Sequence, residues 1–185
     1  MDACALDIET TGLGPQDRIT CVAIAGEGWS WIWTLKQDAD RDNYKEHIQY
    51  QLDAASTIYA FNGATFDIPV LQREFNFTNQ DVGRWMLKLV DPLYAARALL
   101  GFDACAKLSD ILRLNGVEPK TSTGQQAIVM AREGRWEELA SYCENDTRVT
   151  FELLSKDCIY WTHNLQFRPK SKGVWGCRGL SVDSR

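Results

Sequence analysis

Residues 19–35 of this 185-residue chain restrict its fold more than any other segment, because they predict a β-hairpin. Residues 19–25 are almost wholly apolar, as in a buried strand. Residues 29–35 follow the period-two pattern of a second strand, with Trp29, Trp31, Trp33 and Leu35 alternating with Ser30, Ile32 and Thr34. The three residues Gly26-Glu27-Gly28 form a turn, so the two strands should be antiparallel neighbours.

Further elements surround this hairpin. Residues 3–6 are a short apolar run that ends at Asp7-Ile8-Glu9, which is typical of a buried strand meeting a polar edge. We predict two more strands, at 57–62 and 88–91, the latter being the last strand. We predict helices at 42–52, 67–75, 93–100, 107–114, 125–133 and 135–156. Three strands, then alternation, then helices indicate an α/β fold in which helices cover a mixed sheet.

The composition is that of one globular domain, with 45% apolar and 24% charged residues. No stretch approaches the roughly 20 apolar residues of a membrane span, and no secretory signal is visible, so we expect an intracellular protein without membrane contact. The net charge of −5 disfavours a protein that coats duplex nucleic acid. The six cysteines include no C-x-x-C pair, so we expect reduced thiols.

Two acidic residues close the first strand. Asp7 and Glu9 are two residues apart, so they face the same side of a strand. Because they follow an apolar run, we expect both carboxylates to be half-buried and to repel one another. Such a pair persists where a cation neutralises it.

Asp146 interrupts an apolar helical stripe formed by Leu139, Tyr142, Val149 and Leu153. Tyr142 lies one turn before Asp146 on the same face. A carboxylate in that position needs an ion or several hydrogen-bond donors. The alternative is an aspartate at the edge of the stripe that bonds to a nearby arginine such as Arg148.

Asp67 opens the helix after the fourth strand and has two interpretations. It is either an ordinary N-terminal helix aspartate, favoured by the helix dipole, or a ligand facing the crevice at the carboxyl ends of the strands. Taken singly, the first interpretation is the better one.

Three segments together resemble the motifs of the DEDD exonuclease superfamily: LDIETTGL (6–13), FNGATFDIPVL (61–71) and SYCENDTRVTFELL (141–154). The third, Tyr142-x-x-x-Asp146, resembles the tyrosine subgroup, and the second is similar to proofreading domains of DNA polymerases. The resemblance implies a ribonuclease H-like fold whose five-stranded mixed sheet has the order 3-2-1-4-5. Strand two would be antiparallel to the rest, with helices on both faces.

The resemblance also implies a 3′→5′ exonuclease that hydrolyses phosphodiester bonds at the 3′ end of single-stranded nucleic acid, with DNA favoured, and releases nucleoside 5′-monophosphates. Two Mg²⁺ or Mn²⁺ ions, about 3.5–4 Å apart, would clamp the reacting oxygens. Asp7 would bridge both ions, Glu9 and Asp146 would complete the first, and Asp67 would hold the second. Tyr142 would orient the attacking water. The substrate contacts would be Thr10, Leu13, Asn62 and Phe66.

Several of these positions keep a plainer interpretation. The alternative for Leu13 is an apolar loop residue tucked into the core. The three tryptophans resemble a stacking platform, but their periodicity favours a helix-covered face. Lys120 and the basic stretch from Arg168 to Lys172 would meet phosphates, although solvated side chains are the default.

Residues 1–163 are expected to form the exonuclease domain, and residues 164–185 an irregular basic tail. An RNA-trimming exoribonuclease and a non-catalytic nucleic-acid-binding relative stay open as alternatives. A separate polymerase or replication protein would be a natural partner.

Overall fold

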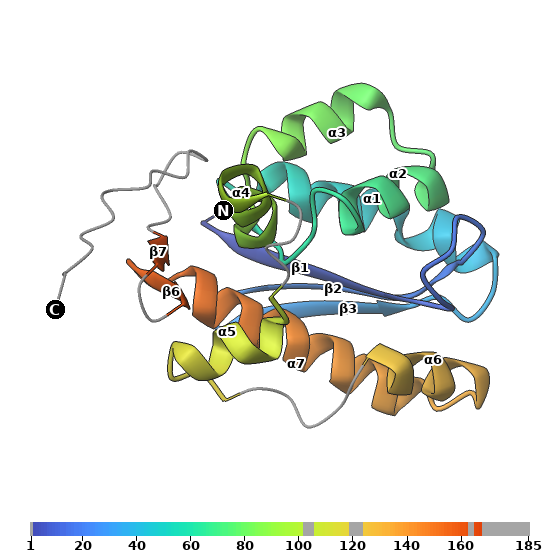
Figure 1. Cartoon of the computed structure of the whole chain (residues 1–185). Helices are drawn as coiled ribbons and strands as arrows, with labels where there is room; N and C mark the ends of the chain where they lie inside the picture. Colours follow the sequence, from blue (N-terminus) through green and yellow to red (C-terminus); the bar gives the residue numbers. More distant parts are fainter. Residues whose placement is uncertain (1, 102–105, 119–123, 163–164, 168–185) are drawn as a thin grey trace, which may run out of the picture.

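The computed structural model describes residues 2–101, 106–118, 124–162 and 165–167. It has a central sheet between two layers of helices (Figure 1). One face of the sheet is covered by α1 (Ala39–Ala54), α2 (Asp67–Phe75) and α3 (Asn79–Met86). The other face is covered by α7 (Trp136–Leu154), with α5 (Leu108–Leu114) and α6 (Gly124–Arg132) beside it; α4 (Pro92–Leu100) follows the last strand of the sheet.

The sheet has five strands in the order β3-β2-β1-β4-β5, which confirms the predicted order. Its strands are β1 (Cys4–Thr10), β2 (Ile19–Gly26), β3 (Trp29–Thr34), β4 (Ile58–Tyr59) and β5 (Leu89–Val90). Strand β2 is antiparallel to both β1 and β3, whereas β1, β4 and β5 are parallel. The register of β1 against β2 shifts between Glu9 and Thr10, which marks a bulge at the end of β1.

The hairpin turn is one residue shorter than predicted. Gly26 pairs with Trp29, so Glu27 and Gly28 alone connect the two strands. Gly28 has a φ of 76°, and a Cβ at Gly26 would lie 2.4 Å from Trp29 Cε2. Glycine is therefore required at both positions, for the turn at Gly28 and for the close approach of the indole at Gly26.

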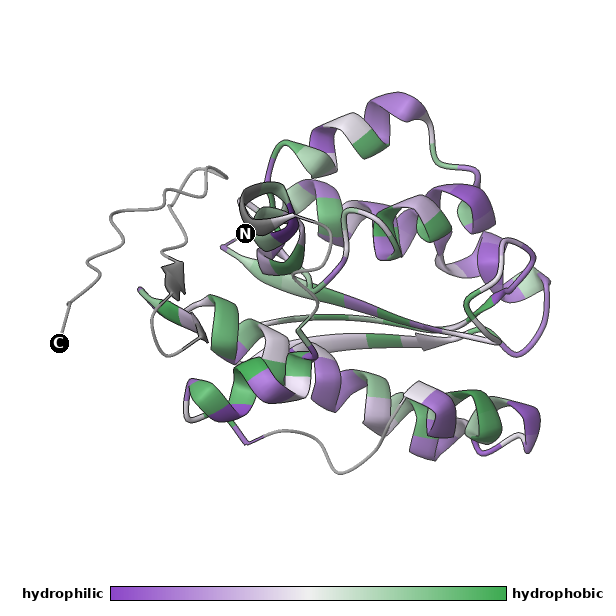
Figure 2. Ribbon diagram, viewed as in Figure 1, coloured by the Kyte–Doolittle hydropathy of each residue, from purple (hydrophilic) through white to green (hydrophobic). Residues whose placement is uncertain are grey.

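Alternation along the strands sends residues into two different cores. Leu6 and Ile24 join large side chains of α1, α2 and α3, including the fully buried Trp85. On the opposite face, small residues of β2 meet small residues of α6 and the side chains of α7; these are Cys21, Ala23, Ala127, Ala131, Leu139, Tyr142 and Cys143. Small side chains let α7 lie close to the sheet, and Figure 2 shows hydrophobic residues on the inner sides of both helical layers.

Helix α3 was not predicted. A capping box starts it: Asp81 N donates to Thr78 Oγ1 (3.1 Å), and Thr78 N donates to Asp81 Oδ2 (2.8 Å). The pattern Thr-x-x-Asp is visible in the sequence, but the short helix that follows has few apolar residues, so its periodicity is weak. Trp85 anchors it to the core.

The strand predicted at residues 88–91 is confirmed as β5, but the prediction that it is the last strand was wrong. Strands β6 (Ile159–Thr162) and β7 (Leu165–Phe167) pair as a second, two-stranded sheet. Strand β7 falls inside the segment predicted to be irregular, and Ile159 and Trp161 of β6 join the core formed with α4, α5 and α7. The basic residues of 168–185, together with Lys120, Cys105 and Cys177, lie outside the described residues.

The tryptophans of β3 partly follow the prediction of a helix-covered face. Trp33 is buried and Trp29 packs against the same core, whereas Trp31 is 52% exposed and stacks on Trp33 with ring centroids 6.5 Å apart. Strand β3 is the edge of the sheet, and Trp31 is the one of its three indoles that is mostly exposed. Of the cysteines that the structure describes, Cys4, Cys21 and Cys143 are buried thiols outside any disulfide. None of the helices among the described residues is long and apolar enough to span a membrane.

Candidate active site

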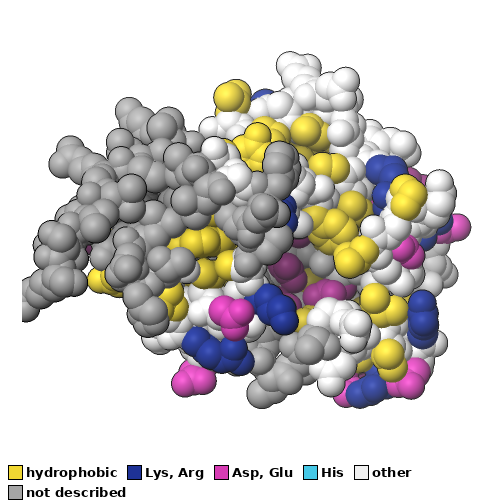
Figure 3. Space-filling model, in the orientation of Figure 1, with side chains coloured by type: hydrophobic (Ala, Val, Ile, Leu, Met, Phe, Trp, Pro, Cys, Tyr) yellow, Lys and Arg dark blue, Asp and Glu magenta, His cyan; other side chains and the backbone are white. Residues whose placement is uncertain are grey.

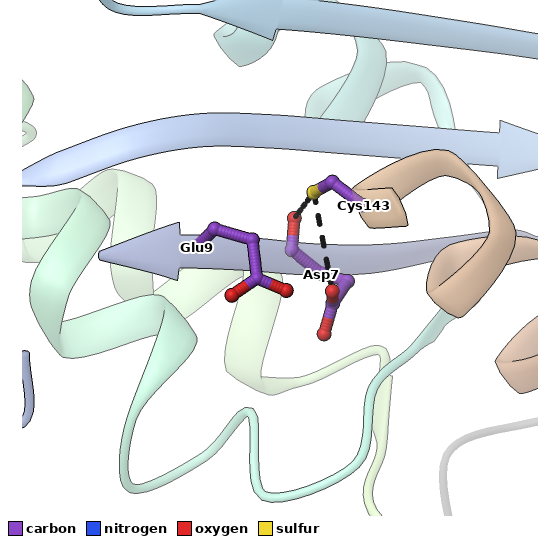
Figure 4. Close-up of side chains that lie close together, drawn as sticks. All are labelled: Asp7, Glu9 and Cys143. Atoms are coloured by element: carbon purple, nitrogen blue, oxygen red, sulfur yellow. Dashed lines mark hydrogen bonds between the residues drawn. The ribbon is translucent and has the colours of Figure 1, made fainter. Parts of the chain in front are cut away.

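Asp7 and Glu9 lie on the face of β1 that α7 covers. The neighbouring Leu6 and Ile8 point into the core under α1–α3, so alternation directs both acidic side chains to the opposite face, as predicted. Figure 4 shows the two carboxylates on the same side of β1. Asp7 is half-buried and Glu9 is 9% exposed. Two like charges are therefore held together with limited access to water.

Asp67 lies at the open edge of β1. Strand β4 pairs with β1 only through Cys4 and Ala5, and then the chain leaves the sheet. Beyond this point Ile8 N donates to Asp67 Oδ1 (3.2 Å), so the carboxylate occupies the place where a neighbouring strand would offer a carbonyl. Asp67 is 4% exposed. The prediction that it faces the end of the first strand therefore agrees with its position.

The electrostatics of Asp67 follow from this position. Burial raises the pKa of its carboxyl well above the usual value, and the charges of Asp7 and Asp91 raise it further. The hydrogen bond from Ile8 acts in the opposite direction and does not outweigh burial. Burial and the neighbouring charges therefore favour the protonated form of Asp67.

Helix α7 brings Tyr142 and Asp146 into the same interface. The two residues are 8% and 1% exposed, and they continue the buried stripe that contains Leu139 and Leu153. The pKa of the Tyr142 phenol is raised by burial and then by the charges of Glu9 and Asp7. A tyrosine phenol is already neutral at physiological pH, and burial and the neighbouring charges keep it so.

The arginine alternative for Asp146 is not supported by the contacts of Arg148. Arg148 Nη2 lies 2.8 Å from Glu144 Oε1 and 2.9 Å from Ser30 Oγ. These contacts are on the outer side of α7, where Arg148 is 47% exposed, whereas Asp146 faces inward. Asp146 therefore belongs to the buried face of the helix and not to its edge.

Cys143 is a site residue that sequence reasoning missed. We interpreted it as one of several buried thiols; it is buried, but its Sγ lies 3.7 Å from Asp7 O and 3.9 Å from Asp7 Oδ2. Ligand atoms of Asp7, Glu9 and Cys143 all lie within 4.8 Å of one another. The pKa of the thiol is raised by burial and then by its contact with Cys21, so the neutral S–H can donate to Asp7. The only signal in the sequence is its place directly after Tyr142.

Asp91 was also missed, because we interpreted it only as the end of a strand. It is 4% exposed and accepts hydrogen bonds from Asn62 N (3.1 Å) and Ala64 N (2.9 Å). The same carboxylate caps α4 by accepting from Leu93 N and Tyr94 N. Asp91 therefore fixes the turn that leads to Asp67 against the first turn of α4.

Leu13 projects from the loop between β1 and β2. It is 85% exposed, so the interpretation that it is tucked into the core was wrong. The loop is held by Asp17, which accepts from Thr11 Oγ1 (2.9 Å) and Gly14 N (2.6 Å). A large apolar side chain is therefore presented to solvent on an ordered loop directly after Glu9 and the buried Thr10.

Asn62 has a left-handed backbone conformation, with a φ of 72°. Its Oδ1 accepts from Thr65 Oγ1 (2.7 Å) and from Arg97 Nη1 of α4 (3.0 Å). Phe66, also predicted as a substrate contact, packs partly buried against the core under α1–α3. Asn62 thus begins the compact turn that leads to Asp67. Its contact with Arg97 was not evident from the sequence.

Figure 3 shows acidic side chains at the floor of a hollow, with hydrophobic and basic side chains around it. The sequence matches the family described as the RNase H superfamily over residues 4–156. The chain belongs to the RNase H superfamily. No curated protein sequence matches it.

Two solved structures share the fold of this RNase H-superfamily chain. One, described as the apo form of a nuclease, has 20% identity and a TM-score of 0.55, covering 82% of this chain and 69% of its own. The other is the EXO domain of Nibbler from Aedes aegypti, with 15% identity and a TM-score of 0.51, covering 82% and 75%. At these identities the likeness shows the fold alone.

The acidic residues of this RNase H-superfamily chain fit a divalent cation. Their donors are carboxylate oxygens, which Mg²⁺ and Mn²⁺ prefer. Glu9, Asp67 and Asp146 are each less than a tenth exposed, and Asp7 raises the pKa of Asp67. A bound cation would offset this repulsion and return Asp67 to its ionised form. Cys143 would be a softer neighbour to such an ion.

Proposed function

We propose that this chain is a metal-dependent 3′→5′ exonuclease of the DEDD type that acts on single-stranded nucleic acid, with DNA favoured over RNA. The observation that carries the proposal is the gathering of Asp7, Glu9 and Asp67 around the end of β1, with α7 packed over it. Tyr142 comes from that helix, and the charges of Glu9 and Asp7 act on its phenol. Buried carboxylates with a neutral tyrosine beside them suit hydrolysis of a phosphodiester.

Each residue has a definite task in this proposal. Asp7, Glu9, Asp67 and Asp146 would hold two Mg²⁺ or Mn²⁺ ions, which would supply a more acidic water and neutralise charge on the phosphoryl group. The water oxygen would attack phosphorus, and the bond from phosphorus to the 3′-oxygen of the preceding nucleotide would break. The terminal nucleotide would be released as a nucleoside 5′-monophosphate, and a proton from the water would complete the new 3′-hydroxyl of the shortened strand. Tyr142 aligns the water through its hydroxyl; its raised pKa excludes it as the base.

The terminal nucleotide would lie between the loop of Leu13 and the turn of Asn62. Leu13 is free to press against the last base, because 85% of its surface is exposed on an ordered loop. The backbone at Thr10 and the residue Phe66 would contact the same nucleotide, since Thr10 follows Glu9 and Phe66 precedes Asp67 in the sequence. This arrangement favours an end of a strand over the middle of a duplex.

The test uses 5′-labelled and 3′-labelled single-stranded DNA and RNA of one sequence, incubated with Mg²⁺, Mn²⁺ or EDTA. We expect the 5′-labelled strand to give a ladder of progressively shorter products and the 3′-labelled strand to release labelled mononucleotide at once. We expect no cleavage in EDTA. RNA cut faster than DNA would make the enzyme an exoribonuclease. Binding without cleavage by either ion would instead identify a non-catalytic relative.

Two variants complete this experiment. Asp7→Ala should abolish the ladder while its melting temperature stays unchanged or rises, because like-charge repulsion is relieved. Asp110→Ala removes a carboxylate that is 62% exposed on α5 and should cleave like the wild type. Near-normal cleavage by Asp7→Ala with Mg²⁺ would refute the assignment.

A further inference from the structure

Arg97 differs from most arginines in the part of the chain that the structure describes. Seven others lie within 4.0 Å of a carboxylate: Arg18, Arg41, Arg73, Arg84, Arg113, Arg135 and Arg148. No such ion pair involves Arg97 among the described residues. Its side chain is half-buried, and its hydrogen bond runs from Nη1 to the neutral Oδ1 of Asn62 (3.0 Å).

A half-buried guanidinium that pairs with no carboxylate among residues 2–101, 106–118, 124–162 and 165–167 is unusual, because burial removes part of its hydration. It carries five N–H donors in a planar fork, and the bond to Asn62 uses one of them. The remaining donors suit the planar, bidentate recognition of a phosphate. The net charge of the chain is −5, so a positively charged side chain near the acidic site would help to bind a negatively charged nucleic acid strand.

The position of Arg97 relative to the site is fixed by a short chain of contacts. Asn62 begins the turn that ends at Asp67, and Phe66 N donates back to Asn62 O (3.0 Å), so the turn is compact. Asp91 ties this turn to the start of α4, the helix that carries Arg97. The guanidinium is therefore hydrogen-bonded directly to the turn that leads to Asp67, beside the proposed metal site.

We propose that Arg97 binds a phosphate of the substrate strand other than the one being cleaved. The inference rests on the proposed exonuclease function, since the scissile phosphate belongs to the carboxylate site. Asn62 holds the guanidinium in place through Oδ1, and Thr65 Oγ1, at 2.7 Å from that oxygen, fixes Asn62 in turn. Arg97 thus sets the path of the strand as it leaves the site.

The experiment measures binding of a fluorescein-labelled, single-stranded oligonucleotide by anisotropy, with Ca²⁺ in place of Mg²⁺ and intact oligonucleotide verified afterwards. Arg97→Gln removes the charge and keeps an amide donor for Asn62, whereas Arg97→Lys keeps the charge. Loss of one phosphate contact should lower the slope of log K against log [salt] by about 0.7 for Arg97→Gln. The ratio of the wild-type binding constant to that of Arg97→Gln should therefore fall by roughly 2.6-fold between 50 and 200 mM salt. Arg97→Lys should keep most of the wild-type slope.

A second measurement locates the contact. Oligonucleotides that carry one neutral methylphosphonate at successive linkages should bind the wild type more weakly at one position, and Arg97→Gln should be insensitive at that same position. Arg113→Ala, which removes an arginine 62% exposed on α5, serves as the matched control and should behave like the wild type. Melting temperatures verify that each variant is folded.

Two results would overturn the inference. Arg97→Gln with the affinity and salt slope of the wild type would show no phosphate contact. Arg97→Gln could instead bind more weakly than the wild type by the same factor at every salt concentration and with every methylphosphonate position. Arg97 would then only support Asn62. Failure of the proposed function looks different, because the wild type would then degrade no strand with Mg²⁺ or Mn²⁺.

Discussion

Replacing Tyr142 with Phe separates the chemistry of the site from its packing. The ring is 8% exposed and packs with Cys21, Ala23 and Leu139, and Phe keeps these contacts. The cost in stability should therefore be that of one hydroxyl hydrogen bond, about 0.5–1.5 kcal/mol. Truncation to Ala would instead leave a cavity and cost roughly 3–5 kcal/mol.

The effect of Tyr142→Phe on catalysis should be much larger than its effect on stability. Loss of one preorganised contact to the nucleophile costs on the order of 10²–10³ in rate, or about 3–4 kcal/mol. The four carboxylates are untouched, so the dependence on Mg²⁺ should hardly change, and the defect should appear in kcat and not in KM.

Single-turnover cleavage of single-stranded DNA at saturating Mg²⁺ measures this effect. Tyr50→Phe is the matched control, because Tyr50 is 62% exposed on α1, on the opposite face of the sheet. A loss smaller than about threefold for Tyr142→Phe, well under 1 kcal/mol, would refute the role of the hydroxyl and leave Tyr142 as a core residue.

Three further predictions test other parts of the structure. Cys143→Ser keeps a donor to Asp7 and should need close to the wild-type Mg²⁺ concentration, whereas Cys143→Ala should need several-fold more, as measured by a Mg²⁺ titration of cleavage; equal titrations would contradict this. Leu13→Ala should change the free energy of unfolding by no more than about 0.5 kcal/mol, because Leu13 is exposed, yet it should slow removal of the terminal nucleotide. Thr78→Ala should cost about 1 kcal/mol in urea unfolding at pH 7. Since Thr78 helps to lower the pKa of Asp81 to about 2, the stability from Asp81 is present above pH 4 and lost as the pH falls toward 2, and Thr78→Ala should weaken this acid dependence.

The sequence by itself predicted most of the elements and the four carboxylates proposed for the site, but not helix α3 or strands β6 and β7. Apolar periodicity located the hairpin of β2 and β3 and the stripe of α7, since burial on one face leaves a repeat that can be counted. It also revealed Asp146 as a charge in that stripe, and spacing alone put Asp7 and Glu9 on one side of β1. The strand order came from the motifs, whose resemblance to a known fold supplied the topology.

Only the tertiary structure decided which side chains surround these carboxylates. Cys143, Asp91 and Arg97 have no special spacing, and their roles arise from contacts between segments as distant as β1 and α7 or the Asn62 turn and α4. Leu13 illustrates the same limit, because an apolar loop residue can be buried or exposed, and the loop held by Asp17 settles the choice. Local sequence fixes periodicity and therefore faces, whereas the neighbours across an interface depend on how closely two elements approach.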